Sequence, residues 1–171
     1  MAKYLSTKTY GNDRGLSCTF RQWRATHSHC SLLHGYSIGI KLTFSSDTLD
    51  DRNWVMDFGG LKKFKSWADY MFDHTLIVAE DDPELQLFET LDDIRGGWNN
   101  VGVCDLRVVP AVGCEGFAKL AYDAMELILN DLKKTDPDSI AMNGRYPVGA
   151  SVKLESVEVF EHASNSAIYQ G

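Results

Sequence analysis

A strict alternation of apolar with small or polar side chains over residues 36–44 constrains the possible fold most. Because successive side chains of a strand point to opposite faces, this pattern predicts a strand with one buried face. Five apolar side chains share that face: Tyr36, Ile38, Ile40, Leu42 and Phe44. A sheet with one apolar face needs a second layer to cover it, so the rest of the chain must supply that layer.

Two segments with helical spacing can supply the covering layer. After Asp57, which is a typical N-cap residue, apolar side chains recur with a period of 3.6 residues as far as Phe72. Residues 113–134 carry a longer apolar stripe and end in two lysines, which suit a helix C-terminus. The sequence therefore predicts two amphipathic helices.

The remaining elements are shorter. We expect further strands at 16–24, 106–109 and 150–161, a short helix at 85–91, and loops at 96–100 and 135–147. The alternation of the last strand changes phase between Leu154 and Val157, which indicates a bulge. The order of elements predicts an α+β fold in which two helices pack on one face of an antiparallel sheet.

Composition limits the function. At 171 residues, the chain is expected to form a single domain over residues 1–171. No segment is apolar and long enough to span a membrane, and the N-terminus has no apolar signal core, so we expect a cytoplasmic protein with no membrane partner. The four cysteines are then expected to be free thiols. The net charge of −7 argues against nucleic acid as a partner but allows a small phosphorylated substrate.

Residues 27–36 contain three of the five histidines and one of the four cysteines. Imidazole and thiolate are the usual ligands of zinc, and a thiolate is also a common catalytic nucleophile or base. A polar loop with a few histidines is the alternative. The density of His27, His29, Cys30 and His34 favours a metal or catalytic site.

Other polar residues have both a functional and a structural interpretation. Asp73 and His74 are an adjacent carboxylate and imidazole that can transfer protons near neutral pH, or a surface pair at a helix C-terminus. Glu161 ends the last strand and could accept two parallel N–H bonds from a heterocycle, or face solvent. Glu115 could bind a ligand or merely match a helix dipole, and Arg24 could bind phosphate or merely solvate the surface.

Taken together, these segments resemble the 6-pyruvoyl-tetrahydropterin synthase and 6-carboxy-tetrahydropterin synthase family from about Cys18 to Tyr169, with an insertion at about 80–105. Five motifs in the family's order carry the resemblance. They are the cysteine and His-Gly at residues 30–36, the Asp-Phe turn at 54–62, the Asp-His pair at 73–74, the helix start at 110–115, and the glutamate eight residues before Tyr169.

The resemblance implies the tunnelling fold, a four-stranded antiparallel sheet with two helices on one face. It also implies a homo-oligomer, typically a hexamer, with active sites between subunits, zinc held by three histidines, and 7,8-dihydroneopterin triphosphate as substrate. By the same resemblance, Cys30 is the general base, Asp73 and His74 relay protons, Glu161 anchors the pterin ring, and Glu115 lies near it.

Two positions depart from the family pattern. Arg24 stands where the first zinc histidine is expected, and Tyr36 replaces the second histidine of His-Gly-His. Arginine cannot coordinate zinc. His27 and His29 are two residues apart, so in an extended segment they face the same way and, with His34, would restore three nitrogen ligands. The alternative is a site without metal in which Arg24 binds phosphate or carboxylate.

The expected function is that of a zinc-dependent lyase that makes 6-carboxy-tetrahydropterin, which feeds 7-deazaguanine and queuosine synthesis. A 6-pyruvoyl-tetrahydropterin synthase is the nearest alternative. A second alternative is a tunnelling-fold protein that binds a purine or pterin through Glu161 without zinc. A third is a cysteine hydrolase that uses Cys30 with His74.

Overall fold

The structure, a computed structural model, describes residues 3–93, 102–134 and 146–171, and its central element is the strand β3 (His34–Ser46). β3 contains the predicted strand at 36–44. Four side chains of the predicted apolar face are fully buried: Ile38, Ile40, Leu42 and Phe44. The strand and its buried face are therefore confirmed. The loop predicted at 96–100, and most of the one predicted at 135–147, lie outside the described residues.

Six further strands complete the described sheet: β1 (Tyr4–Tyr10), β2 (Leu16–Phe20), β4 (Thr75–Ala79), β5 (Leu106–Val109), β6 (Lys153–His162) and β7 (Asn165–Gln170). The order is β5-β4-β2-β3-β6-β7, and β1 also pairs with β3. β1, β2 and β6 run antiparallel to β3, whereas β4 runs parallel to β2 and β5 parallel to β4. The prediction of four antiparallel strands is therefore wrong in strand number and partly in direction.

The missed strands have weak sequence patterns. All five residues of β4 are buried, so the strand has no alternation and was grouped with the end of the preceding helix. β1 and β7 are largely exposed and carry few apolar side chains. The strand predicted at 16–24 ends at Phe20, because the chain then turns and the N–H of Gln22 donates to the carbonyl of Cys30.

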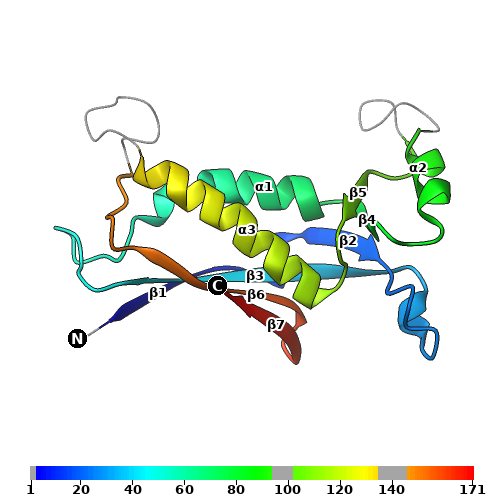
Figure 1. The fold of residues 1–171 in the computed structure, drawn as a ribbon, viewed down its shortest axis with the longest axis horizontal. Helices are drawn as coiled ribbons and strands as arrows, with labels where there is room; N and C mark the ends of the chain where they lie inside the picture. The colour runs from blue at the N-terminus through cyan, green and yellow to red at the C-terminus, as the bar shows by residue number, and fades with distance from the viewer. Residues whose placement is uncertain (1–2, 94–101, 135–145) are drawn as a thin grey trace.

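Both long helices lie on the same face of the sheet, as predicted (Figure 1). They are α1 (Lys62–Phe72), which follows the 3₁₀ turn η3 (Phe58–Leu61), and α3 (Cys114–Lys133). Asp57 caps η3 by accepting the N–H of Gly59 at 2.8 Å, which confirms it as an N-cap. Phe117 of α3 joins the layers, because its ring lies 5.1 Å from Phe20 of β2 and 5.3 Å from Phe72 of α1.

The third helix, α2 (Leu85–Asp93), confirms the short helix predicted at 85–91 and lies beside β4 and β5 at one end of the molecule (Figure 1). Its Phe88 packs with Leu76 and Val78 of β4 in a small second apolar cluster. No described helix has the length and apolarity that crossing a membrane requires. The single domain with an insertion at 80–105 stays a prediction.

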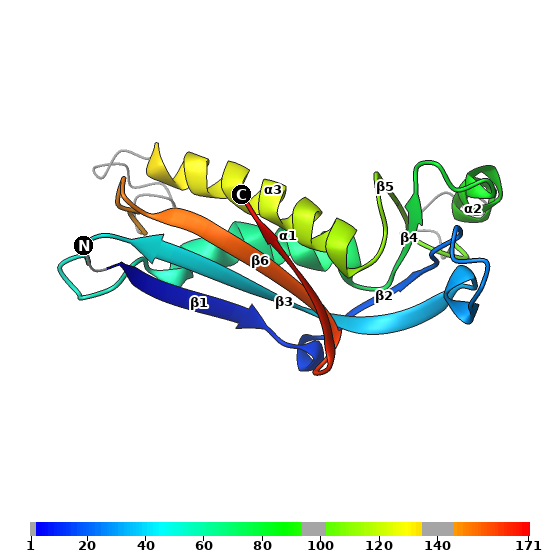
Figure 2. The same ribbon diagram turned by 60° about the horizontal axis from the view of Figure 1, so that its bottom comes forward.

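Two 3₁₀ turns matter for the site: η1 (Asn12–Arg14), between β1 and β2, and η2 (His29–Ser31), in the His-rich segment. Figure 2 shows η1 next to the hairpin of β6 and β7, and η2 at the same end of the molecule as α2. The predicted bulge in the last strand is confirmed, because Glu155 has no partner between the pairs Thr43–Ser156 and Phe44–Leu154.

Candidate active site

Glu161 lies at a second bulge, at the end of β6. The pairing of β6 with β7 shifts register between Phe160 and His162, so Glu161 has no partner in the described ladder. The pairing of β6 with β3 already ends at Phe160, opposite Gly39. The backbone N–H of Glu161 instead faces the sulfur of Cys114, the first residue of α3, and acts to lower the pKa of that thiol against the larger effect of burial. Glu161, predicted to bind substrate, is thus set against the first turn of α3.

Three weakly acidic groups surround the Glu161 carboxylate. Burial, the neighbouring Cys114 and the charge of Glu161 raise the pKa of Cys18 to about 12. Burial and the charges of Glu161 and Glu115 raise the pKa of Cys114 to about 11. Burial, followed by the charge of Glu161, also raises the pKa of Tyr36. At neutral pH these three groups therefore stay neutral S–H and O–H groups beside the carboxyl groups of Glu161 and Glu115.

The start of α3 brings two further polar side chains to this site. Gly113 precedes the helix with a φ of 97°, a left-handed conformation that favours glycine. A Cβ atom at Gly113 would lie only 2.7 Å from the side-chain nitrogen of Gln22. That nitrogen donates to the carbonyl of Val112 at 2.7 Å. The Glu115 carboxylate lies on the same side, 3.7 Å from the Cβ position of Gly113.

The His-rich segment folds into consecutive tight turns rather than an extended chain. Ser28 caps η2 through a hydrogen bond from the N–H of Cys30 to its hydroxyl oxygen, and the N–H of Ser28 donates to the carbonyl of Ala25. Cys30 is half-buried, and its charge is among those that raise the pKa of Tyr36. Cys30, the predicted base, and Glu161 therefore both lie within electrostatic range of Tyr36.

His34 is the one predicted metal ligand whose ring is held in place. Its Nδ1 lies 2.6 Å from the carbonyl of Leu32, and since a carbonyl can only accept, Nδ1 is the donor. In a neutral imidazole held in this way, Nε2 is the nitrogen with the free lone pair. His27 and His29 are exposed. Across 3–93, 102–134 and 146–171, no group of three or more His, Cys, Asp and Glu side chains is arranged to hold a metal ion. The three imidazoles thus do not form a zinc site in this conformation, and zinc stays a prediction.

Arg24 has another partner than the one predicted. Its guanidinium lies 2.7 Å from the carboxylate of Asp81, which also accepts a hydrogen bond from the Trp23 indole. The adjacent Arg21 binds Asp82 through two hydrogen bonds. These contacts join the segment after β2 to the turn before α2. A role of Arg24 in substrate binding stays a prediction, and it would require Arg24 to leave Asp81.

Asp73 and His74 form the predicted pair, but His74 lies on the face of the sheet that α1 and α3 do not cover. The Nδ1 of His74 lies 2.5 Å from the Asp73 carboxylate, and 86% of the His74 side chain is exposed. His74 lines a hollow of about 450 Å³ together with Ser17 and Thr19. These two residues alternate along β2 with Cys18 and Phe20, which face the helices, so the hollow lies on the other side. Among the hydrogen bonds of the described residues, none joins Cys30 to His74, as the cysteine hydrolase alternative would require.

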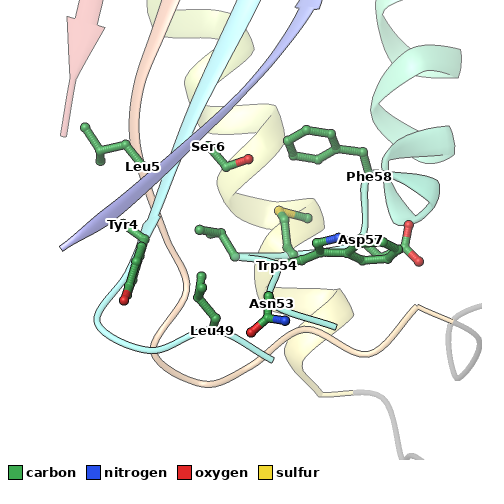
Figure 3. Close-up of a pocket in the computed structure, with 10 residues that line it drawn as sticks. Tyr4, Leu5, Ser6, Leu49, Asn53, Trp54, Asp57 and Phe58 are labelled. Carbon is green, nitrogen blue, oxygen red and sulfur yellow. The ribbon is translucent and has the colours of Figure 1, made fainter. Parts of the chain in front are cut away.

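A separate pocket of about 460 Å³ lies at the end of β1 and contains none of the predicted site residues. Figure 3 shows Tyr4, Leu5 and Ser6 of β1 on one side and Trp54 and Phe58 on the other. Its lining is mainly aromatic and aliphatic, with Asp57 engaged in capping η3. We therefore assign the candidate active site to the surroundings of Glu161.

Sequence reasoning missed Gln22 and the thiol of Cys114 as parts of this site. Gln22 was placed in a strand that ends two residues earlier, and its partner Val112 is 90 positions away. For Cys114 a signal existed, because a Gly-Cys-Glu sequence opens the predicted helix at the point where a ligand would approach.

Known proteins resemble this chain in sequence and in fold. A sequence model of the family described as 6-pyruvoyl tetrahydropterin synthase matches residues 12–171, which covers both β2 and the whole candidate site. The chain belongs to the 6-pyruvoyl tetrahydropterin synthase family. The family resemblance expected from the sequence is therefore confirmed. Of the motifs that carry this resemblance, the one nearest the site is Glu161, eight residues before Tyr169.

Curated relatives of this chain are named 6-carboxy-5,6,7,8-tetrahydropterin synthase. The Rickettsia typhi protein is 39% identical over 57 residues, which are 33% of this chain and 41% of that protein. The Aquifex aeolicus protein is 28% identical over 102 residues, which are 60% of each chain. The match thus spans less than two thirds of the length of either relative.

Solved structures show the fold of the family. An uncharacterized protein from Wolinella succinogenes superposes with a TM-score of 0.73 at 19% identity, over 100% of this chain and 99% of the other. The 6-pyruvoyl tetrahydropterin synthase of Plasmodium vivax superposes with a TM-score of 0.60 at 15% identity, over the same shares of the chains. At these identities, the similarity shows a common mixed α+β fold alone.

Proposed function

We propose that this protein is a pterin-forming lyase that acts on 7,8-dihydroneopterin triphosphate, with 6-carboxy-tetrahydropterin as the favoured product. The observation that carries the proposal is the placement of Glu161 beside Cys114 and Tyr36, in a chain of the 6-pyruvoyl tetrahydropterin synthase family. The names of the Rickettsia and Aquifex relatives favour the 6-carboxy product. A 6-pyruvoyl product is the alternative within the same family.

Glu161 supplies the chemistry that recognises the pterin ring. An ionised carboxylate accepts two parallel hydrogen bonds from adjacent N–H groups, as it does from a guanidinium. The pterin has such an edge, formed by a ring N–H and the amino group beside it. The neutral groups of Tyr36, Cys18 and Cys114 leave Glu161 as the anion that meets this edge. The pterin then lies against the first turn of α3.

Cys30 is the proposed general base. As a thiolate, it removes a carbon-bound proton from the side chain of the substrate, and the electron pair left on carbon drives the departure of the triphosphate anion. For the 6-carboxy product, water then cleaves the bond between the first two side-chain carbons, so that the first stays as the carboxyl and the other two leave as acetaldehyde. Cys30 and Glu161 both lie within electrostatic range of Tyr36, which allows the ring and the reacting side chain to be held together. The carboxylate of Asp73 orients His74, whose Nε2 is exposed and can exchange protons with the substrate.

The opposite placement of His74 supports a site built from two subunits. Glu161 lies against the first turn of α3, on the helix side of the sheet, whereas His74 lines the hollow with Ser17 and Thr19 on the other side. A single chain therefore offers each half of the catalytic set to a different neighbour. We propose a homo-oligomer, expected to be a hexamer, with active sites between subunits.

Zinc binding stays a separate prediction. His34 presents a free Nε2, but His27 and His29 do not join it in the described conformation, so no step above depends on a metal. If the metal binds, it would polarise substrate oxygens as a Lewis acid. Metal analysis of the purified protein tests this. Stoichiometric zinc that is lost in His34→Ala would support the rearranged ligand set, and zinc retained in that variant would contradict it.

Turnover tests the proposed function. The wild-type protein should convert 7,8-dihydroneopterin triphosphate to a 6-substituted tetrahydropterin, which chromatography identifies. Cys30→Ala should keep the oligomer and lose activity by roughly 100-fold or more, as expected for removal of a general base. Thr48→Ala, at an exposed residue beyond the end of β3 that lies away from Cys30, is the control. Unchanged turnover in Cys30→Ala would remove Cys30 from the mechanism.

The second candidate function is binding without turnover. The contact of Arg24 with Asp81 and the separation of the imidazoles favour it, because both depart from the family's catalytic pattern. Under this alternative the wild-type protein would bind a pterin or purine through Glu161 and return the triphosphate substrate unchanged.

A further inference from the structure

The backbone of Glu161 is held by side chains rather than by the ladder of the sheet. The bulge removes its pairing with β7, and the pairing of β6 with β3 ends at Phe160. Its N–H faces the sulfur of Cys114. Its carbonyl oxygen accepts from the side-chain nitrogen of Asn12 at 3.1 Å. The direction of the Glu161 carboxylate therefore depends on these two contacts.

Asn12 reaches three carbonyl groups, one on β3 and two at the end of β6. Its Nδ2 lies 2.6 Å from the carbonyl of Ser37, 3.1 Å from that of Glu161 and 3.4 Å from that of Phe160. The hydroxyl of Ser37 in turn donates to the carbonyl of Asn12 at 2.6 Å, which fixes η1 against β3. A primary amide has two N–H groups, so it can serve β3 and the end of β6 at once.

A purely local role does not explain these contacts. The residue that caps η1 is Gly11, and no side chain caps that turn. The acceptors of Asn12 are 25, 148 and 149 positions away in the sequence. Figure 2 shows η1 directly beside the β6–β7 hairpin. The side chain of Asn12 is therefore committed to the bulge that carries Glu161.

We propose that Asn12 is a positioning residue that holds the bulge at Glu161, so that the carboxylate meets the N–H edge of a pterin. This inference rests on the proposed function, since Glu161 is the proposed anchor. Asn12 itself does not touch the ligand. Its loss should release the carbonyl of Glu161 and let the carboxylate sample directions that pair poorly with the ring.

The test compares Asn12→Ala with Asn165→Ala. Asn165 is an exposed asparagine on β7 that pairs with His162 at the same bulge, so it is a matched control. Binding of 6-carboxypterin is measured by calorimetry, which separates affinity from the number of competent sites. Hydrogen exchange at residues 160–162 reports the bulge directly.

We expect Asn12→Ala to weaken 6-carboxypterin binding about tenfold, the loss that one net hydrogen bond predicts. The number of sites should stay that of the wild type, and exchange at the bulge should become faster. Asn165→Ala should behave as the wild type in both measurements. A merely structural role would lower the number of competent sites and leave the affinity of the remaining ones unchanged.

Two results would contradict the role of Asn12 without contradicting the proposed function. In the first, the wild type binds the pterin and Asn12→Ala binds it equally well, whatever the exchange rate. In the second, exchange at the bulge does not change. A wild-type protein that binds no pterin overturns both this inference and the proposed function, so the two failures are distinguishable.

Discussion

At the scale of single residues, the thiols of the site differ in accessibility: Cys30 is partly accessible, whereas Cys18 and Cys114 are buried. Cys18 and Cys114 are 2% and 8% exposed, and their pKa values are raised to about 12 and about 11. At pH 8 a thiol with a pKa near 11 is ionised to roughly one part in a thousand. Cys30 is half-buried, in a turn beside the site.

Iodoacetamide at pH 8 should therefore modify Cys30 well before Cys18 or Cys114 in the folded protein. Because the pKa of Cys114 is raised, its reactivity should increase only as the pH approaches 11. Mass spectrometry of the native protein, with Cys30→Ser as the control, measures the order of labelling. Labelling of Cys114 at the rate of Cys30 would show that the Glu161 bulge does not shield it.

Gly113 is a second residue whose identity matters. Replacing it with alanine places a Cβ in a left-handed conformation and 2.7 Å from Gln22. We expect Gly113→Ala to lower the free energy of unfolding by roughly 1–3 kcal/mol. Gly149→Ala is the control, since the nearest atom to a Cβ there is 3.8 Å away in Val152.

Chemical denaturation of both variants tests this prediction. The control should stay within about 0.5 kcal/mol of the wild type. Equal stability of Gly113→Ala and the wild type would mean that Gln22 does not lie against the start of α3.

At the scale of elements, one buried ion pair connects the turn before α2 to the segment after β2. The Asp82 side chain is 1% exposed and binds Arg21 at 2.5 Å. Burial acts to raise the pKa of Asp82, but hydrogen bonds from Arg21 and from the N–H of Glu84 outweigh it and lower that pKa. The contribution to stability is then complete above the ordinary pKa of 3.8 and is lost as the pH falls through the lower folded value.

Asp82→Asn should lower the free energy of unfolding at pH 7 by roughly 2–3 kcal/mol, because Arg21 loses its charged partner. The difference from the wild type should shrink as the pH falls below the ordinary pKa of aspartate. Denaturation at pH 7 and at acidic pH measures both effects. Asp81→Asn, in a more exposed pair, is the control and should cost less. A constant difference at all pH values would contradict the assignment.

The elements also show what the sequence could predict. β3 and α3 have clear periodicity, because each buries one face only, and both were predicted. β4 is buried on both faces, so neither period appears in it. The motifs located Glu161 and Glu115 correctly at a strand end and a helix start. The contacts of Asn12 and Gln22 could not be predicted, since each spans a long sequence separation.

At the scale of the whole molecule, the sheet divides the proposed catalytic set. Glu161 lies on the face covered by α1 and α3, whereas His74 lines the hollow on the other face. This arrangement gives a single chain two incomplete sites. The central claim is therefore that a pterin-transforming site forms only when Cys30 of one subunit meets His74 of another.

Subunit mixing tests that claim most directly. Cys30→Ala and His74→Ala oligomers should each be inactive on 7,8-dihydroneopterin triphosphate. After they are dissociated and reassembled together, random pairing of subunits should restore about a quarter of wild-type activity, because about one site in four then receives both intact residues. Mixed oligomers that remain inactive while the wild type treated in the same way recovers would contradict a shared site, and an inactive wild type would contradict the lyase itself.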